Sequence, residues 1–147
     1  MPPAAEALSS LDRALAALGT GLPILLGQFA ATLFLLGIGI AAYSAITPFH
    51  ERRLIGQGNV AAGLVVAGTL VALGLPLGVT LATSRTVLDI VVWGSVALVL
   101  QLAAFAVSAL ALGGLRAAIE GGNAAAALML VGVQIAVALL NAGAMAG

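Results

Sequence analysis

The sequence predicts an all-α integral membrane protein. Four transmembrane helices are expected as two parallel two-helix repeats, preceded by a short N-terminal amphipathic helix. Hydrophobic residues make up 63% of the 147 positions and charged residues only 7%, and the mean hydropathy is +1.24. A soluble domain has roughly a quarter of its residues charged, so this chain would expose large apolar patches in water.

The first 21 residues are expected to form an interfacial segment. The spacing of their leucines predicts an amphipathic helix over residues 9–19 on the membrane surface, with a capping box at Ser9 and Asp12. The leucines with this helical spacing are Leu8, Leu11, Leu15 and Leu18. A leader without a role is the alternative. A secretory signal is not indicated, because the segment lacks a basic beginning.

Four stretches have the length and polarity of membrane spans. They are expected at residues 22–46, 60–83, 90–113 and 124–146, and none contains a charged residue or histidine. Lipid offers backbone groups no hydrogen-bond partner, so these stretches are helices; the period-two alternation of a barrel is absent. An even number of spans places both termini on one side of the membrane.

The chain resembles itself at a separation of 64 residues. Residues 55–78 align with 119–142, with nine identities in 24 positions against roughly three expected by chance. The identities are Ile55/Ile119, Gly58/Gly122, Asn59/Asn123, Ala61/Ala125, Ala62/Ala126, Leu64/Leu128, Gly68/Gly132, Ala72/Ala136 and Leu75/Leu139. This pattern predicts two-helix repeats at residues 22–83 and 84–147 that cross in the same sense, related by a pseudo-twofold axis along the membrane normal.

A charged box, residues 47–59, separates the first two spans. Thr47 and the following proline predict the start of a short helix, and Gly56 or Gly58 can end it. Asn59 and Asn123 are expected to cap the second and fourth spans. In this interpretation the box only ends one helix and begins the next.

The box also has a functional interpretation, as a docking surface or a pore mouth that uses Glu51 and Arg52. Catalysis or metal binding by residues 47–59 has little support in the sequence. His50 is the only histidine and there is no cysteine, so a metalloprotease-type zinc site and thiol chemistry are not expected. A Ser-His-Asp set and a phosphate loop are also missing. The chain is expected to be no enzyme and to bind no cofactor or metal.

The turn at residues 84–89 carries a second candidate group. Asp89 lies three residues after Thr86, which is the spacing of a capping box at the N-terminus of the third span, with Arg85 close enough to pair with it. The alternative is a carboxylate that senses protons or cations at the membrane edge. Tyr43 and Trp93 are placed to act as interfacial aromatics on opposite sides of the bilayer.

Amide side chains inside the spans form a third group. Asn123, Gln134 and Asn141 lie within about 20° of one another on the fourth helix. Gln101 lies in the middle of the third helix, and Gln28 lies in the first. Such groups either bond to neighbouring helices or line a polar pathway.

Small residues predict where helices approach closely. The expected pairs are Gly37/Ala41, Gly63/Ala67 and Gly74/Gly78. Pro76 is expected to kink the second span.

Charge suggests orientation and partners. The side with the two long loops holds three arginines and the other side two, which favours long loops 47–59 and 114–123 in the cytoplasm and both termini outside. The net charge is zero and lysine is absent, so nucleic acid is not an expected partner. The expected partners are the lipid bilayer and either further copies of the chain or another membrane protein.

Five pieces of the sequence resemble the YjfL-type bacterial inner-membrane family, a domain of unknown function. They are "ITPFHERRLIGQGNVAAG", "GLPLG", "LDIVVWGSVALVLQL", "IEGGNAAAALMLVG" and "LLNAGAMAG", within residues 22–147. The resemblance implies two tandem two-helix units in a bacterial inner membrane and implies no activity. The motif positions carried over are Thr47, Pro48, Glu51, Gly58, Asn59, Pro76, Asp89, Trp93, Gln101, Gly122, Asn123 and Asn141. His50 stands where the family commonly has an acidic residue.

Two functions follow as hypotheses. The first is a non-enzymatic membrane protein that acts by assembly, as a homo-oligomer or as part of a membrane complex. The second is an oligomeric channel or transporter subunit with a polar path along Gln101, Gln134 and Asn141. A membrane enzyme built on His50, Glu51 and Asp89 ranks last.

Overall fold

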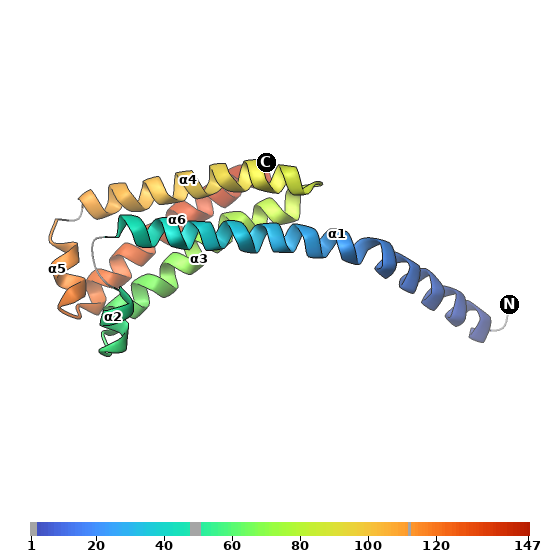
Figure 1. The fold of residues 1–147 in the computed structure, drawn as a ribbon, viewed down its shortest axis with the longest axis horizontal. Coiled ribbons are helices and arrows are strands. Elements are labelled where there is room, and N and C mark those ends of the chain that lie inside the picture. Colours follow the sequence, from blue (N-terminus) through green and yellow to red (C-terminus); the bar gives the residue numbers. More distant parts are fainter. Residues whose placement is uncertain (1–2, 48–50, 112) are drawn as a thin grey trace.

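The computed structural model describes residues 3–47, 51–111 and 113–147, and within these ranges all regular elements are helices (Figure 1). Four are long: α1 (Pro3–Ile46), α3 (Val60–Thr83), α4 (Val87–Ala111) and α6 (Ala124–Ala146). Two are short: α2 (Glu51–Gly56) and α5 (Leu115–Glu120). The four long helices are long and apolar enough to cross a membrane, so the predicted all-α class with four spans is confirmed.

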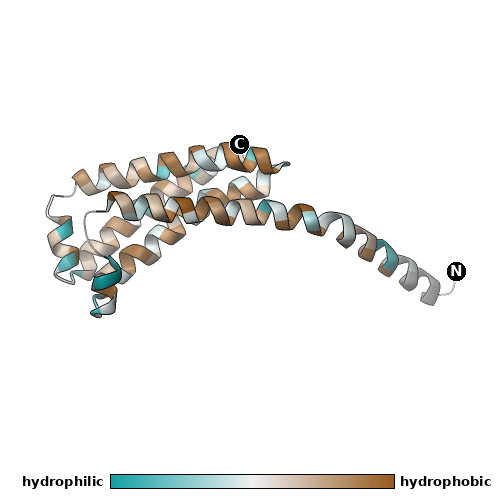
Figure 2. Ribbon diagram, in the orientation of Figure 1, coloured by the Kyte–Doolittle hydropathy of each residue, from teal (hydrophilic) through white to brown (hydrophobic). Residues whose placement is uncertain are grey.

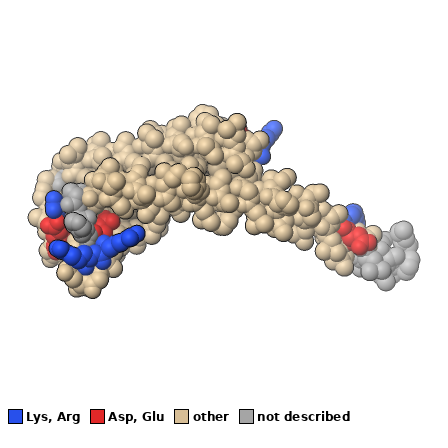
Figure 3. All heavy atoms as spheres, viewed as in Figure 1, with Lys and Arg blue, Asp and Glu red and all other residues tan. Residues whose placement is uncertain are grey.

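The long helices form an up-and-down bundle. Helices α1 and α4 run in one direction and α3 and α6 in the other, with α2 and α5 together at one end (Figure 1). The sides of the bundle are mostly apolar (Figure 2). Charged side chains gather at the end formed by α2 and α5 and on the projecting N-terminal part (Figure 3). An apolar middle with charged ends is the distribution that a bilayer selects.

Helix α1 extends well beyond the bundle. Its 44 residues reach about 66 Å at ~1.5 Å per residue, which is about twice the hydrocarbon thickness of a bilayer. The predicted N-terminal helix is present, but it is continuous with the first span and passes through Pro23 without a break. Ser9 therefore lies inside α1, and the cap predicted there was wrong.

Helices α3 and α6 lie parallel and make the most extensive contact in the bundle. At Gly68 of α3 an added Cβ would stand 2.4 Å from Val131 of α6, so only glycine fits. Ala61, Val65 and Ala127 are fully buried in the adjoining core. In lipid, close packing of this kind is a main source of helix association.

Helices α1 and α4 pack through two further glycines. An added Cβ at Gly39 would stand 2.8 Å from Leu98, and one at Gly94 would stand 2.7 Å from Leu35. Each leucine therefore occupies the space that the facing glycine leaves open. The bundle thus closes at Gly39, Gly68 and Gly94.

The small-residue pairs predicted from the sequence are not the ones that pack inside the chain. An added Cβ would meet nothing within 4 Å at four of their positions, Gly37, Gly63, Gly74 and Gly78. For packing within one chain that prediction was wrong. Spacing identifies glycines on one helix face, but it does not say which face turns inward.

The two junctions that lead into α3 and α6 have the same structure 64 residues apart. Gly58 and Gly122 both have a φ of 81°, the left-handed conformation that favours glycine. In both junctions the next residue, Asn59 or Asn123, donates its backbone N–H to the carbonyl five residues earlier at 2.9 Å. Each asparagine side chain then accepts the N–H three residues later, at 3.0 and 3.1 Å respectively. The predicted glycine ends and asparagine caps are therefore confirmed.

The contact at Gly68 can be tested by adding one methyl group. We expect Gly68→Ala to destabilise the purified protein by about 1–2 kcal/mol, because overpacking against Val131 outweighs the better helix propensity of alanine. Gly19→Ala is the matched control, since its Cβ would meet nothing within 4 Å. Thermal unfolding in detergent measures both variants. Equal melting of Gly68→Ala and the wild type would contradict the close approach.

Candidate functional site

A buried polar cluster lies where α3, α4 and α6 meet. Thr69 of α3 donates its hydroxyl to the Gln134 side-chain carbonyl at 3.0 Å. Gln101 of α4 donates its amide to the backbone carbonyl of Gln134 at 2.9 Å. All three side chains are at most 5% exposed. The structure thus brings together Gln101 and Gln134, two of the predicted amides, and adds Thr69.

A second amide contact lies further along α6. Asn141 donates its side-chain amide to the backbone carbonyl of Ala97 in α4 at 2.9 Å. Since Gln134 and Asn141 are seven residues apart, the two contacts are about 10 Å apart along the helix. Buried amides therefore hold α6 to α4 at two levels of the bundle.

The amides are not fully satisfied. Among the described residues, the buried side-chain atoms without a partner are Gln101 Oε1, Gln134 Nε2 and Asn141 Oδ1. A cavity of about 10 Å³, lined by Tyr43, Thr69, Gln101 and Gln134 among others, adjoins the first two. That volume is about enough for one water, which can donate to Gln101 Oε1 and accept from Gln134 Nε2.

Glu51 and Arg52 begin the short helix α2 and line a cavity of about 190 Å³ that α1 and α3 complete. The hydroxyl of Tyr43 in α1 donates a short hydrogen bond to Glu51. Burial raises the pKa of the Glu51 carboxyl above its ordinary range, and the Tyr43 bond lowers it part of the way back. His50, the neighbouring candidate, lies outside the described residues.

Tyr43 is a candidate site residue that the sequence analysis did not connect with Glu51. It was expected at the bilayer interface, but it is 2% exposed and packs edge-to-face on Phe105 of α4, with ring centroids 4.7 Å apart. It lines both the cavity beside Glu51 and the small cavity beside Gln101. The available signal was that the single tyrosine of the sequence lies only eight residues before Glu51.

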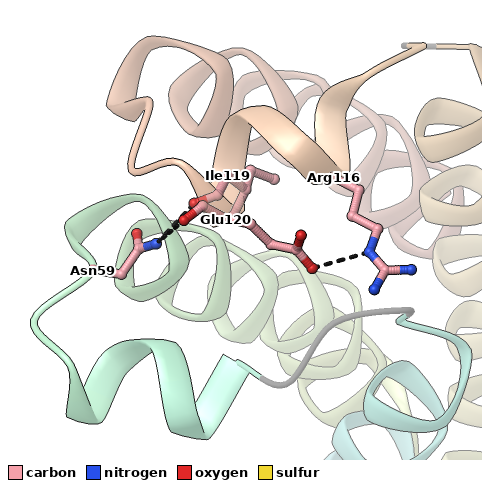
Figure 4. A network of polar contacts seen from close by, with 4 residues as sticks. All are labelled: Asn59, Arg116, Ile119 and Glu120. Carbon is pink, nitrogen blue, oxygen red and sulfur yellow. Dashed lines mark hydrogen bonds and ion pairs between the residues drawn. The ribbon is translucent and has the colours of Figure 1, made fainter.

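Asn59 joins the two halves of the chain (Figure 4). Besides capping α3, it donates its amide to the backbone carbonyls of Ile119 and Glu120, at 2.9 and 3.1 Å, where α5 ends. On α5 itself, Arg116 and Glu120 form an exposed ion pair at 3.0 Å. Asn59 therefore adds a donor at the end of α5, where the Ile119 carbonyl also accepts the Gly122 N–H at 3.0 Å.

Asp89 and Trp93 lie at the opposite end, away from Glu51 and Arg52. The Asp89 carboxylate accepts the backbone N–H of Thr86 at 2.9 Å, and the Thr86 hydroxyl accepts the N–H of Asp89 at 3.1 Å. This is the reciprocal capping box that the spacing predicts. Arg85 forms no ion pair with Asp89 within the described part of the chain. Both residues and the half-exposed Trp93 line a cavity of about 510 Å³.

The predicted site residues thus separate into three places. Glu51 and Arg52 lie at one end, the amides Gln101, Gln134 and Asn141 lie in the core, and Asp89 and Trp93 lie at the far end. Asn59 and Asn123 cap helices at the first end. Within the described ranges no three His, Cys, Asp or Glu side chains lie together as metal ligands would.

The Glu51–Tyr43 contact generates a pH prediction. A carboxyl whose pKa is raised on folding adds stability at low pH, and that stability is lost as pH rises through the folded pKa. We therefore expect the stability of the wild type relative to Glu51→Gln to fall as pH rises from about 4. Thermal unfolding at several pH values measures this difference. Tyr43→Phe removes the bond that favours the charged form, so the fall should move to higher pH. A difference that rises with pH would contradict the raised pKa of Glu51 and thus the burial of its carboxyl.

Comparison with known proteins supports this architecture. Residues 17–145 match the family model described as Domain of Unknown Function (DUF350). The UPF0719 inner membrane protein YjfL of Escherichia coli strain K12 is 36% identical over 103 residues, which cover 70% of this chain and 78% of that protein. The protein of the same name from Escherichia coli O157:H7 matches equally. No solved structure matches.

These matches agree with the four apolar helices. An inner-membrane, multi-pass location follows from the relatives and the spans together. The chain therefore belongs to the YjfL-type membrane family described as Domain of Unknown Function (DUF350).

Proposed function

We propose that this protein is a non-enzymatic membrane protein that acts by assembly, as a homo-oligomer built from duplicated two-helix units. The observation that carries the proposal is a set of glycines on α3 and α6 where, among the described residues, an added Cβ would have open space around it. Added Cβ atoms at Gly63, Gly74, Gly78 and Gly132 would meet nothing within 4 Å. Glycine lowers helix propensity, and in membranes its usual benefit is close helix contact.

The buried amides support the same role. Gln101, Gln134 and Asn141 each bond to another helix of the same chain. Such bonds fix the bundle as a rigid unit with defined outer faces, which assembly requires. The charged end around Glu51 and Arg52 then remains available to a further membrane protein.

The mass of the particle tests this proposal. Purified in a mild detergent or extracted in native nanodiscs, the protein should have the mass of a defined multiple of 14.3 kDa after correction for bound lipid. A strictly monomeric particle without a partner in both media would contradict it.

A second candidate is an oligomeric channel or transporter subunit. The unpaired atoms on Gln101, Gln134 and Asn141, with room for a water between the first two, favour it. This candidate expects ion or solute flux in liposomes that is abolished in the Gln134→Leu/Asn141→Leu double variant. A defined oligomer without flux, or flux that survives both substitutions, would count against it.

A further inference from the structure

The α3–α6 contact uses different faces of the two helices. Gly68 of α3 meets Val131 of α6, and we define the contact face of α3 as the buried residues at helical spacing around it, Ala61, Val65, Gly68 and Ala72. On α6 the contact face is Ala127, Val131, Gln134 and Ala138, in which Val131 is half-buried and the others are buried. Residues three or four apart share one side of a helix, so each set forms a single face.

The 64-residue correspondence assigns each contact face a counterpart on the other helix. The counterpart of the α3 face is the outer face of α6, defined as Ala125, Met129, Gly132 and Ala136, and all four residues are exposed. The counterpart of the α6 face is the outer face of α3, defined as Gly63, Ala67, Leu70 and Gly74, which is half-buried or exposed. The chain thus carries the two faces that a second contact of this kind needs, the outer face of α6 and the outer face of α3. They lie on opposite sides of the α3–α6 pair.

The two asparagine caps also differ, because only one of them bonds to the other half of the chain. Asn59 donates its amide to the carbonyls of Ile119 and Glu120. The corresponding bond would join Asn123 to the carbonyls of Ile55 and Gly56, at the end of α2. Among the described residues Asn123 makes no such bond: its side chain is exposed and only caps α6. A second copy with its α2 beside Asn123 would supply these carbonyls.

The contacts of α1 and α4 also differ between the two halves of the chain. Helix α4, in the second half, lies against both α3 and α6. Its counterpart α1 lies against α3, but within the described ranges it makes at most a marginal contact with α6. The contact that α1 lacks is the one that an α6 from another chain would provide.

Side-chain polarity is matched across the unused faces. Inside the chain, Thr69 bonds to Gln134. The residues at the corresponding positions are Val133 and Leu70, which are 37% and 41% exposed. Both members of the polar pair are therefore replaced by apolar side chains, so a contact between these faces would leave no buried polar group unsatisfied.

From this correspondence we propose that the outer face of α6 packs on the outer face of α3 in a second copy of the chain, continuing the α3–α6 interface head to tail. This surface deepens the assembly proposed above and rests on it. Because two different faces meet, the contact is heterologous and repeats into a closed ring in the membrane plane. Two-helix units from successive chains then alternate around an axis along the membrane normal.

Cysteine cross-linking distinguishes this arrangement from others. The natural chain contains no cysteine. Ala67 and Gly132 correspond to Val131 and Gly68, whose Cβ positions would be 2.9 Å apart, so cysteines there come within disulfide reach across the interface. Two single variants, Ala67→Cys and Gly132→Cys, carry tags of different size and are expressed in one membrane and oxidised there.

The expected result is a disulfide dimer that contains one of each variant, with neither variant bonding to itself. A Gly132→Cys or Ala67→Cys homodimer without the mixed species would show a symmetric contact and overturn the proposal. No disulfide in a particle of oligomeric mass would overturn this interface and leave the assembly intact. A monomeric mass together with no disulfide would overturn both.

A second measurement uses a bulky side chain. Gly132→Leu should reduce the oligomer at least tenfold in a mass or in-membrane proximity assay, while its melting as a monomer is preserved, because none of the described residues lies within 4 Å of the added Cβ. Gly21→Leu is the matched control on the projecting part of α1, where the Cβ also meets nothing. An unchanged oligomer in Gly132→Leu would overturn the proposal.

Discussion

The approach of α3 to α6 at Gly68 is the contact on which the rest of the bundle depends. Lipid tails are as apolar as leucine, so burial of apolar surface does not by itself drive helices together in a membrane. Close packing and interhelical hydrogen bonds must do so instead. Gly68 provides the first, and the approach that it permits brings Thr69 within 3.0 Å of Gln134. Helix α4 then docks on this pair through Gln101 and Asn141.

Local chemistry made part of this structure predictable from the sequence. Asn59 and Asn123 cap their helices because an asparagine side chain accepts an early N–H, and Gly58 and Gly122 end the preceding helices because they adopt a positive φ. Thr86 and Asp89 form their capping box for similar reasons. Each of these features involves residues within one or two turns of each other, so no knowledge of the tertiary structure was needed.

What stayed unpredictable was which side of each helix turns inward. The spanning helices are apolar on all sides, so hydropathy does not separate a core face from a lipid face. The glycines that face a neighbouring helix are Gly39, Gly68 and Gly94. Gly37, Gly63 and Gly74 have equally suitable spacing, but among the described residues an added Cβ at these positions would meet nothing within 4 Å. Tyr43 was misplaced for the same reason, since its inward position depends on contacts with Phe105 and Glu51 from distant segments.

The buried amides also bear on whether one chain can carry a polar pathway. The two levels marked by Gln134 and Asn141 are separated by two helical turns. On α4, Leu98 lies between Ala97 and Gln101, and on α6, Ala138 lies between the two amides; these residues are 4% and 0% exposed. The small cavity at the first level has room for about one water, and apolar packing separates it from the second level. The amides of a single chain therefore act as two separate hydrogen-bonded contacts between α6 and α4.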